Sequence, residues 1–103
     1  VLFRSIYAAT KAAMTSVTQS MARELAPDRI RVVAIAPGDI ANDDDPGYHA
    51  AIVAKGAGGD IVNQTPLGRG RTRDIGATVA FVCSPDAAFV TGTTWLVDGG
   101  LLA

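Results

Sequence analysis

The chain has 103 residues, 49% of them hydrophobic, and nine basic and ten acidic residues give a formal charge of −1. A charge this close to zero argues against nucleic-acid partners and against binding to an anionic membrane surface. The one cysteine excludes an internal disulfide, no apolar run reaches the ~18 residues of a membrane span, and no signal-peptide pattern opens the chain, so we predict a cytoplasmic protein.

The first five residues, Val1–Ser5, contain no initiator methionine and no turn pattern. Their sequence resembles the in-frame translation of the end of a sequencing adapter. We therefore predict that they are not native and that native coding begins near Ile6. The alternative is that they are the remainder of a truncated edge strand.

The next segment is predicted to be a helix from Tyr7 to about Ala26. Its apolar residues recur at four-residue intervals, and most of its other residues are good helix formers. Pro27 is expected to end the helix, with Asp28 and Arg29 in the turn. The residues that carry the periodicity are Ala9, Ala13, Val17, Met21 and Leu25.

A strand is predicted to follow at residues 30–36, which are short, β-branched and almost continuously apolar. That composition is typical of a strand buried on both faces, as in a parallel sheet. Pro37-Gly38 ends it. Residues 39–65 form a long polar segment with an expected short helix at 48–55, and we predict that it serves as a substrate lid.

A second helix is predicted from Thr72, read as the N-cap, to Cys83, with Asp74 in its first turn. Cys83 is expected to be a buried core thiol. Residues 93–97 are predicted to form a second strand, followed by a turn at residues 98–100. The order of helix, strand, lid, helix and strand indicates an α/β fold with a doubly wound parallel sheet.

Tyr7 and Lys11 are the residues most suggestive of chemistry. Residues four apart share one face of a helix, so an ammonium is expected to lie beside a phenol. A nearby cation favours the phenolate, which suits a proton donor and acceptor. Taken alone, such a pair is more often a solvated surface pair.

Four motifs in order remove that ambiguity: Tyr7-Ala8-Ala9-Thr10-Lys11, then Pro37-Gly38, Thr91-Gly92 and Val97-Asp98-Gly99-Gly100. Together they resemble the short-chain dehydrogenase/reductase family over nearly the whole chain from Tyr7. The resemblance implies the carboxyl-terminal portion of one Rossmann-like NAD(P)-binding domain, spanning residues 1–103. It also implies a homotetramer or homodimer, because the family's last strand and the helix after the tyrosine commonly pack at subunit contacts.

The resemblance implies hydride transfer between NAD or NADP and a small alcohol or ketone. Tyr7 is then the catalytic acid and base, and Lys11 its partner, which also holds the nicotinamide ribose. The backbone near Ile40 is expected to bind the carboxamide, and Asn42 stands where the family commonly has threonine. The implied cofactor-binding residues are Tyr7, Lys11, Pro37, Gly38, Asp39, Ile40 and Asn42; no metal is implied.

The family's Gly-rich turn and its catalytic serine precede the tyrosine and have no counterpart in this sequence; Ser5 is not assigned the serine's role. We therefore expect the 103-residue chain alone to be inactive. The alternative function is a non-catalytic module that joins a related oligomer. The substrate, with 3-oxoacyl groups, sugars, steroids and simple ketones among the candidates, stays open.

Overall fold

The computed structural model describes residues 2–41 and 64–103. The chain divides into two compact units, each described by itself. The first comprises Val1–Ile35 and Val82–Trp95, and the second comprises Ala36–Phe81 and Leu96–Ala103. Most of the predicted lid and its short helix lie outside the described residues. None of the helices in residues 2–41 and 64–103 combines the length and the hydrophobicity that a membrane span needs.

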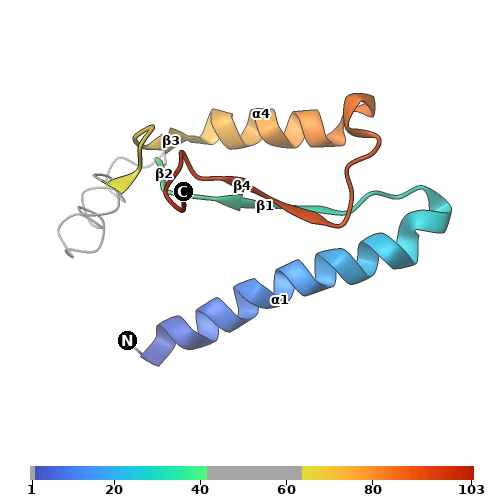
Figure 1. The fold of residues 1–103 in the computed structure, drawn as a ribbon, viewed down its shortest axis with the longest axis horizontal. Coiled ribbons are helices and arrows are strands. Elements are labelled where there is room, and N and C mark those ends of the chain that lie inside the picture. The colour runs from blue at the N-terminus through green and yellow to red at the C-terminus, as the bar shows by residue number, and fades with distance from the viewer. Residues whose placement is uncertain (1, 42–63) are drawn as a thin grey trace. The chain divides into compact units, whose positions relative to one another are not determined.

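Helix α1 extends from Leu2 to Leu25 and is continuous (Figure 1). It begins five residues before the predicted start, because nothing in Leu2–Ser5 is a helix breaker. The edge-strand alternative for these residues is therefore wrong, whereas their non-native origin stays a prediction. A 3-10 turn, η1 (Ala26–Asp28), follows the helix.

The end of α1 follows from Pro27, which has no backbone N–H to continue the helical hydrogen bonds. Arg29 takes a left-handed conformation at φ 58°, and its N–H donates to the Ala26 carbonyl at 3.0 Å. The Ile30 N–H donates to the Leu25 carbonyl at 3.2 Å. The predicted stop at Pro27 is confirmed.

In the first unit, a small residue of α1 packs closely against the segment at Gly92. Ala22 is 5% exposed, and a Cβ on Gly92 would lie 3.3 Å from the Ala22 Cβ, so the two backbones approach closely. The Gly92 N–H donates to the Val32 carbonyl at 2.8 Å, and the Val32 N–H donates to Thr91 Oγ1 at 3.0 Å. Thr91 and Gly92 therefore serve the fold. Ala87, in the 3-10 turn η2 (Pro85–Ala87), is also buried in this unit.

Strand β1 (Val33–Pro37) pairs with β4 (Thr93–Val97) in a two-stranded sheet. One backbone hydrogen bond joins Gly92 to Val32 just before the two strands, and another joins Gly38 to Val97 just after them. The two strands therefore run parallel, as predicted. The boundaries of β4 match the prediction, and β1 starts three residues late because the turn at Arg29 delays it. The expectation that this strand is buried on both faces is wrong: among the described residues, its neighbouring strand is β4 alone, and it is half-buried.

The second unit contains a shorter parallel pair that the sequence did not predict. Strand β2 (Ile40–Ala41) pairs with β3 (Gly70–Arg71), with Ile40 opposite Gly70 and Ala41 opposite Arg71. The pairing places the start of the predicted lid directly beside the residues that follow it. Each strand has two residues, so other contacts must hold the pair in register.

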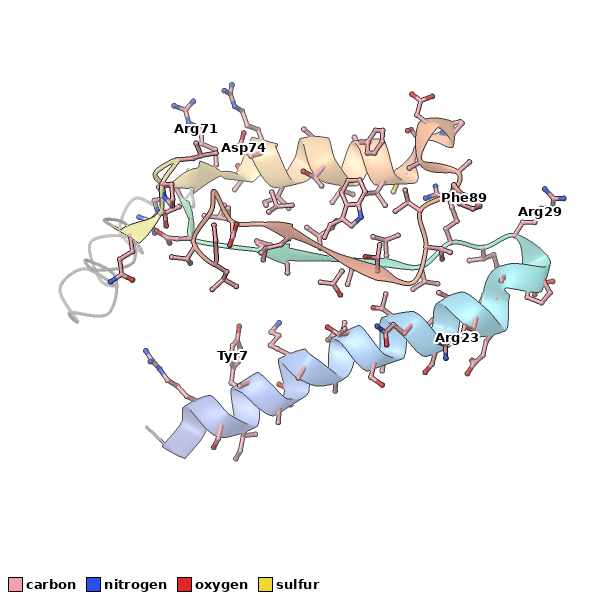
Figure 2. All side chains as sticks on the ribbon, viewed as in Figure 1. Tyr7, Arg23, Arg29, Arg71, Asp74 and Phe89 are labelled. Atoms are coloured by element: carbon pink, nitrogen blue, oxygen red, sulfur yellow. The ribbon has the colours of Figure 1, made fainter. Side chains whose placement is uncertain are left out.

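Helix α4 (Thr72–Cys83) starts immediately after β3. Thr72 is its first helical residue and not its N-cap, so that prediction is wrong. Instead Asp74 Oδ2 accepts a hydrogen bond from the Arg71 N–H at 2.8 Å, which satisfies an otherwise unpaired donor at the helix start. Arg71 and Asp74 lie side by side there (Figure 2). Cys83 is exposed, and the predicted core thiol is therefore also wrong.

The turn after β4 is held by the Asp98 carboxylate. Its Oδ1 accepts from the Gly100 N–H at 3.0 Å, and its Oδ2 accepts from the Leu102 N–H at 2.9 Å. Gly99 and Gly100 both have positive φ, 63° and 87°, a conformation that glycine adopts most readily. This turn acts in the fold and makes no arrangement that suggests catalysis.

Candidate active site

Tyr7 and Lys11 lie on one face of α1. The Lys11 Nζ is 5.5 Å from the centroid of the Tyr7 ring, a cation–π distance. The expectation that this helix places an ammonium beside the phenol is confirmed. The Thr10 hydroxyl, on the same turn, donates to the Tyr7 carbonyl at 2.7 Å.

The phenol of Tyr7 is accessible. Its side chain is 63% exposed and projects away from the α1 backbone (Figure 2). A hydroxyl that is to exchange a proton with a substrate must be reachable within hydrogen-bond distance. Helix α1 fixes the position from which the Tyr7 side chain projects, and the Lys11 ammonium places positive charge beside the Tyr7 ring. The pair therefore has the parts of a proton-transfer site.

The second group of predicted residues lines one recess in the second unit. Pro37, Gly38, Asp39 and Ile40 form one side of a recess of about 560 Å³. It lies where β1 ends, and ligands of open α/β sheets bind at the carboxyl ends of the strands. The residues on its other side are Arg69, Thr72 and Ile75.

Only glycine fits at position 38, at the end of β1, because there is no room for a side chain. A Cβ there would lie 2.7 Å from the Asp98 Cα and 2.8 Å from the Asp98 Cβ, closer than such atoms can stand. The Gly38 N–H also donates to the Val97 carbonyl at 3.0 Å. The backbone at the end of β1 is thus pressed against the turn after β4, which fixes the course of the residues that follow.

Asp39 and Arg69 form an ion pair that the sequence reasoning missed. Arg69 Nη2 donates to Asp39 Oδ1 at 2.9 Å, and the two side chains are 15% and 20% exposed, respectively. The Gly70 N–H donates to the Asp39 carbonyl at 3.0 Å, so the same two segments are also joined through the backbone. The only sequence signal was a pair of opposite charges, one after Pro37-Gly38 and one before Gly70.

The remaining predicted site residue, Asn42, lies outside the described residues. Tyr7 and Lys11 belong to the first unit, whereas residues 37–40 belong to the second. The structure brings together the members of each group, and their joint action stays a prediction. In residues 2–41 and 64–103, no three acidic, histidine or cysteine side chains gather as a metal site would require.

The sequence matches, over residues 2–102, the family model described as Enoyl-(Acyl carrier protein) reductase. It is 40% identical over 98 residues to a tropinone reductase homolog of Arabidopsis thaliana, a match that covers 94% of this chain and 31% of that protein. The chain thus spans about a third of that relative's length.

Solved structures agree with the sequence matches. A short-chain dehydrogenase/reductase of the glucose/ribitol dehydrogenase type from Brucella melitensis is 42% identical, with a TM-score of 0.75 over 92% of this chain and 37% of its own. A blue fluorescent protein from a metagenomic library, solved in complex with NADPH, is 34% identical, with a TM-score of 0.79 over 96% of this chain and 38% of its own.

These likenesses confirm the predicted α/β fold, part of a Rossmann-like doubly wound sheet. The family model covers nearly the entire chain, and the structural matches include named short-chain dehydrogenases. The chain belongs to the short-chain dehydrogenase/reductase family of oxidoreductases.

Proposed function

We propose that the chain is part of an NAD(P)-dependent oxidoreductase that interconverts a small alcohol and the corresponding ketone or aldehyde. The observation that supports this most directly is the Lys11 ammonium 5.5 Å from the ring of an accessible Tyr7. A tyrosine and a lysine four residues apart are by themselves more often a solvated surface pair, so the family match over residues 2–102 is what gives this pair its weight.

A nicotinamide cofactor fits the residues that are present. The recess beside Pro37–Ile40 measures about 560 Å³, within the range of small-molecule sites. Its wall combines apolar surface from Pro37 and Ile40 with backbone polar groups, as an aromatic ring with an amide substituent would require. The NADPH complex of the metagenomic relative supports the same cofactor class. When bound, the nicotinamide supplies or accepts the hydride.

Proton transfer is the part of the reaction assigned to Tyr7. In the reductive direction its hydroxyl donates a proton to the carbonyl oxygen of the substrate; in the oxidative direction the phenolate takes the proton from the alcohol. The Lys11 ammonium places a positive charge beside the Tyr7 ring, 5.5 Å from its centroid. We assign Lys11 a second role, hydrogen bonding to the ribose next to the nicotinamide.

The site needs more than this chain contains. The chain spans about a third of the length of its relatives, and the pyrophosphate-binding turn of a dinucleotide-binding fold lies after its first strand. We therefore propose that Tyr7 and Lys11 act only within a longer polypeptide and that the 103-residue chain alone has no activity. Residues 43–64 are proposed to cover the substrate.

A chimera tests the proposal. Residues 6–103 of this chain replace the matching segment of the Brucella melitensis relative, whose structure supplies the splice point. The chimera is expected to oxidise NADH or NADPH with at least one member of a panel of ketones, aldehydes and 3-oxoacyl thioesters. The isolated chain is expected to oxidise neither. A folded chimera without turnover on the whole panel would refute the assignment.

A second candidate function, assembly with like subunits, rests on α1. Four of its apolar side chains are 41% to 68% exposed and fall within about 80° of the helix circumference. A stripe of this kind is typical of a surface that packs against a partner. We propose a second copy of the chain as that partner, in a homodimer or homotetramer. The residues of the stripe are Ile6, Met14, Val17 and Met21.

A further inference from the structure

The Asp39–Arg69 ion pair occupies a place where it can control the geometry of the cofactor recess. Asp39 directly precedes Ile40, whose backbone is the proposed contact for the carboxamide. Arg69 directly precedes Gly70, the residue opposite Ile40 in the β2–β3 pair. One side-chain bond therefore links the two strands at the point where each begins.

The links between β2 and β3 at this point lie close together. They include the 2.9 Å bond from Arg69 to Asp39 Oδ1, the 3.0 Å bond from the Gly70 N–H to the Asp39 carbonyl, and the two-residue ladder. A two-residue parallel pair has little stability of its own. A charge-assisted bond between side chains that are only 15% and 20% exposed is stronger than a solvated surface pair.

Strands β2 and β3 are closely packed at Gly70. A Cβ on Gly70 would lie 2.6 Å from Ile40 Cδ1. The Ile40 side chain thus fills the space over Gly70, and any slip of β3 along β2 would force it to move. Asp39, Ile40 and Arg69 also line the same recess, so a shift of the pair changes the shape of the proposed nicotinamide site.

We propose that Asp39 and Arg69 are positioning residues, which hold the Ile40 backbone in the orientation that binds the carboxamide of the nicotinamide. The inference rests on the proposed function. It assigns the pair no contact with the reacting atoms; the ion pair acts through Ile40. Loss of the pair therefore weakens recognition of the carboxamide and leaves the contacts to the rest of the dinucleotide unchanged.

A cofactor analogue separates this role from a general effect on folding. The 3-acetylpyridine analogue of NAD(P)⁺ replaces the carboxamide NH₂ with a methyl group, so it cannot donate the amide hydrogen bond. Dissociation constants for both cofactors are measured by fluorescence titration of the chimera. With the pair intact, the analogue binds about fivefold to tenfold more weakly, the usual effect of one lost hydrogen bond.

Asp39→Asn and Arg69→Lys are expected to reduce that preference to about twofold or less, by weakening binding of the nicotinamide form more than binding of the analogue. Arg69→Lys keeps the charge but loses the fork of donors, so it serves where Asp39→Asn fails to fold. Arg71→Gln is the matched control: it removes an exposed guanidinium from β3 and should keep the full preference.

Equal weakening of both cofactors in the two variants would overturn the positioning role, because a loss of fold stability does not distinguish the analogue from the natural form. Unchanged binding of both would overturn it as well. Binding with the expected preference but without turnover on any carbonyl would support the positioning role and refute the proposed function alone. A chimera that binds neither cofactor form would overturn both.

Discussion

Gly38 lies against the backbone of Asp98 so closely that a methyl group at Gly38 would stand 2.7 Å from the Asp98 Cα. The clash is with main-chain atoms, which cannot rotate away. Gly70 offers a contrast, because a methyl group there would meet only the flexible tip of Ile40, at 2.6 Å. Two glycines in the same unit thus differ in what a side chain would displace.

The first prediction follows from that contrast. Gly38→Ala is expected to lower the free energy of unfolding of the chimera by ~2 kcal/mol or more, whereas Gly70→Ala should cost under ~1 kcal/mol. Urea unfolding followed by circular dichroism measures both. Equal losses for the two variants would show that the contact between Gly38 and Asp98 is looser than the structure indicates.

The start of α4 gives a second prediction. Asp74→Ala removes the acceptor of the Arg71 N–H and a negative charge from the first turn, so it should destabilise the chimera by ~1 kcal/mol. Asp86→Ala is the control, because Asp86 is exposed in the first turn of η2 and caps nothing there. Its expected effect is within ~0.5 kcal/mol. Thermal unfolding of both variants decides whether the cap or the charge composition matters.

Lys11 gives the third prediction. Lys11→Met is expected to lower kcat/KM of the chimera about 100-fold, the usual scale for loss of one fixed charge at a developing anion. It should also raise the KM for the cofactor if the ammonium holds the ribose. Arg23→Met, which removes a cation from the last turn of the same helix, should change kcat/KM by about twofold at most. Steady-state kinetics that leave Lys11→Met as active as Arg23→Met would remove Lys11 from the site.

The apolar stripe of α1 gives the fourth. Val17→Asp places a charge in the middle of the stripe, where Val17 is 47% exposed, and should convert the chimera to monomers with its helix content retained. Gln19→Asp, an exposed position outside the stripe, is the control and should keep the oligomer. Light scattering coupled to gel filtration gives the mass. An oligomer that persists in Val17→Asp, or a variant that unfolds, would contradict assembly through this face.

Local signals made most of the element boundaries predictable. Pro27 ends the helix that precedes it, because it removes a donor that the next turn needs, and the β-branched run at residues 93–97 has no competing helical period. The helical spacing of Tyr7 and Lys11 likewise required only the backbone of one helix. The start of α1 was misplaced because Leu2–Ser5 carry neither a cap nor a breaker, so propensity alone decides their state.

Contacts between distant segments were not predictable in the same way. Asp39 and Arg69 stand thirty residues apart, and each looks like an ordinary charge in a polar stretch. The two-residue strands around Ile40 and Gly70 are too short for any periodicity to show. The cap at Asp74 was misassigned to Thr72 because either residue type can satisfy a free N–H at a helix start, and only the course of the backbone through Arg71 decides between them.

The central claim is that Tyr7 transfers the proton, and Tyr7→Phe tests it most directly, since it removes a single oxygen from an exposed ring. The measurement is single-turnover hydride transfer in the chimera, together with the dissociation constant for the cofactor. The account predicts a rate at least about 10²-fold lower, with cofactor binding changed by less than about threefold. A Tyr7→Phe chimera that transfers hydride at the unmodified rate would contradict it.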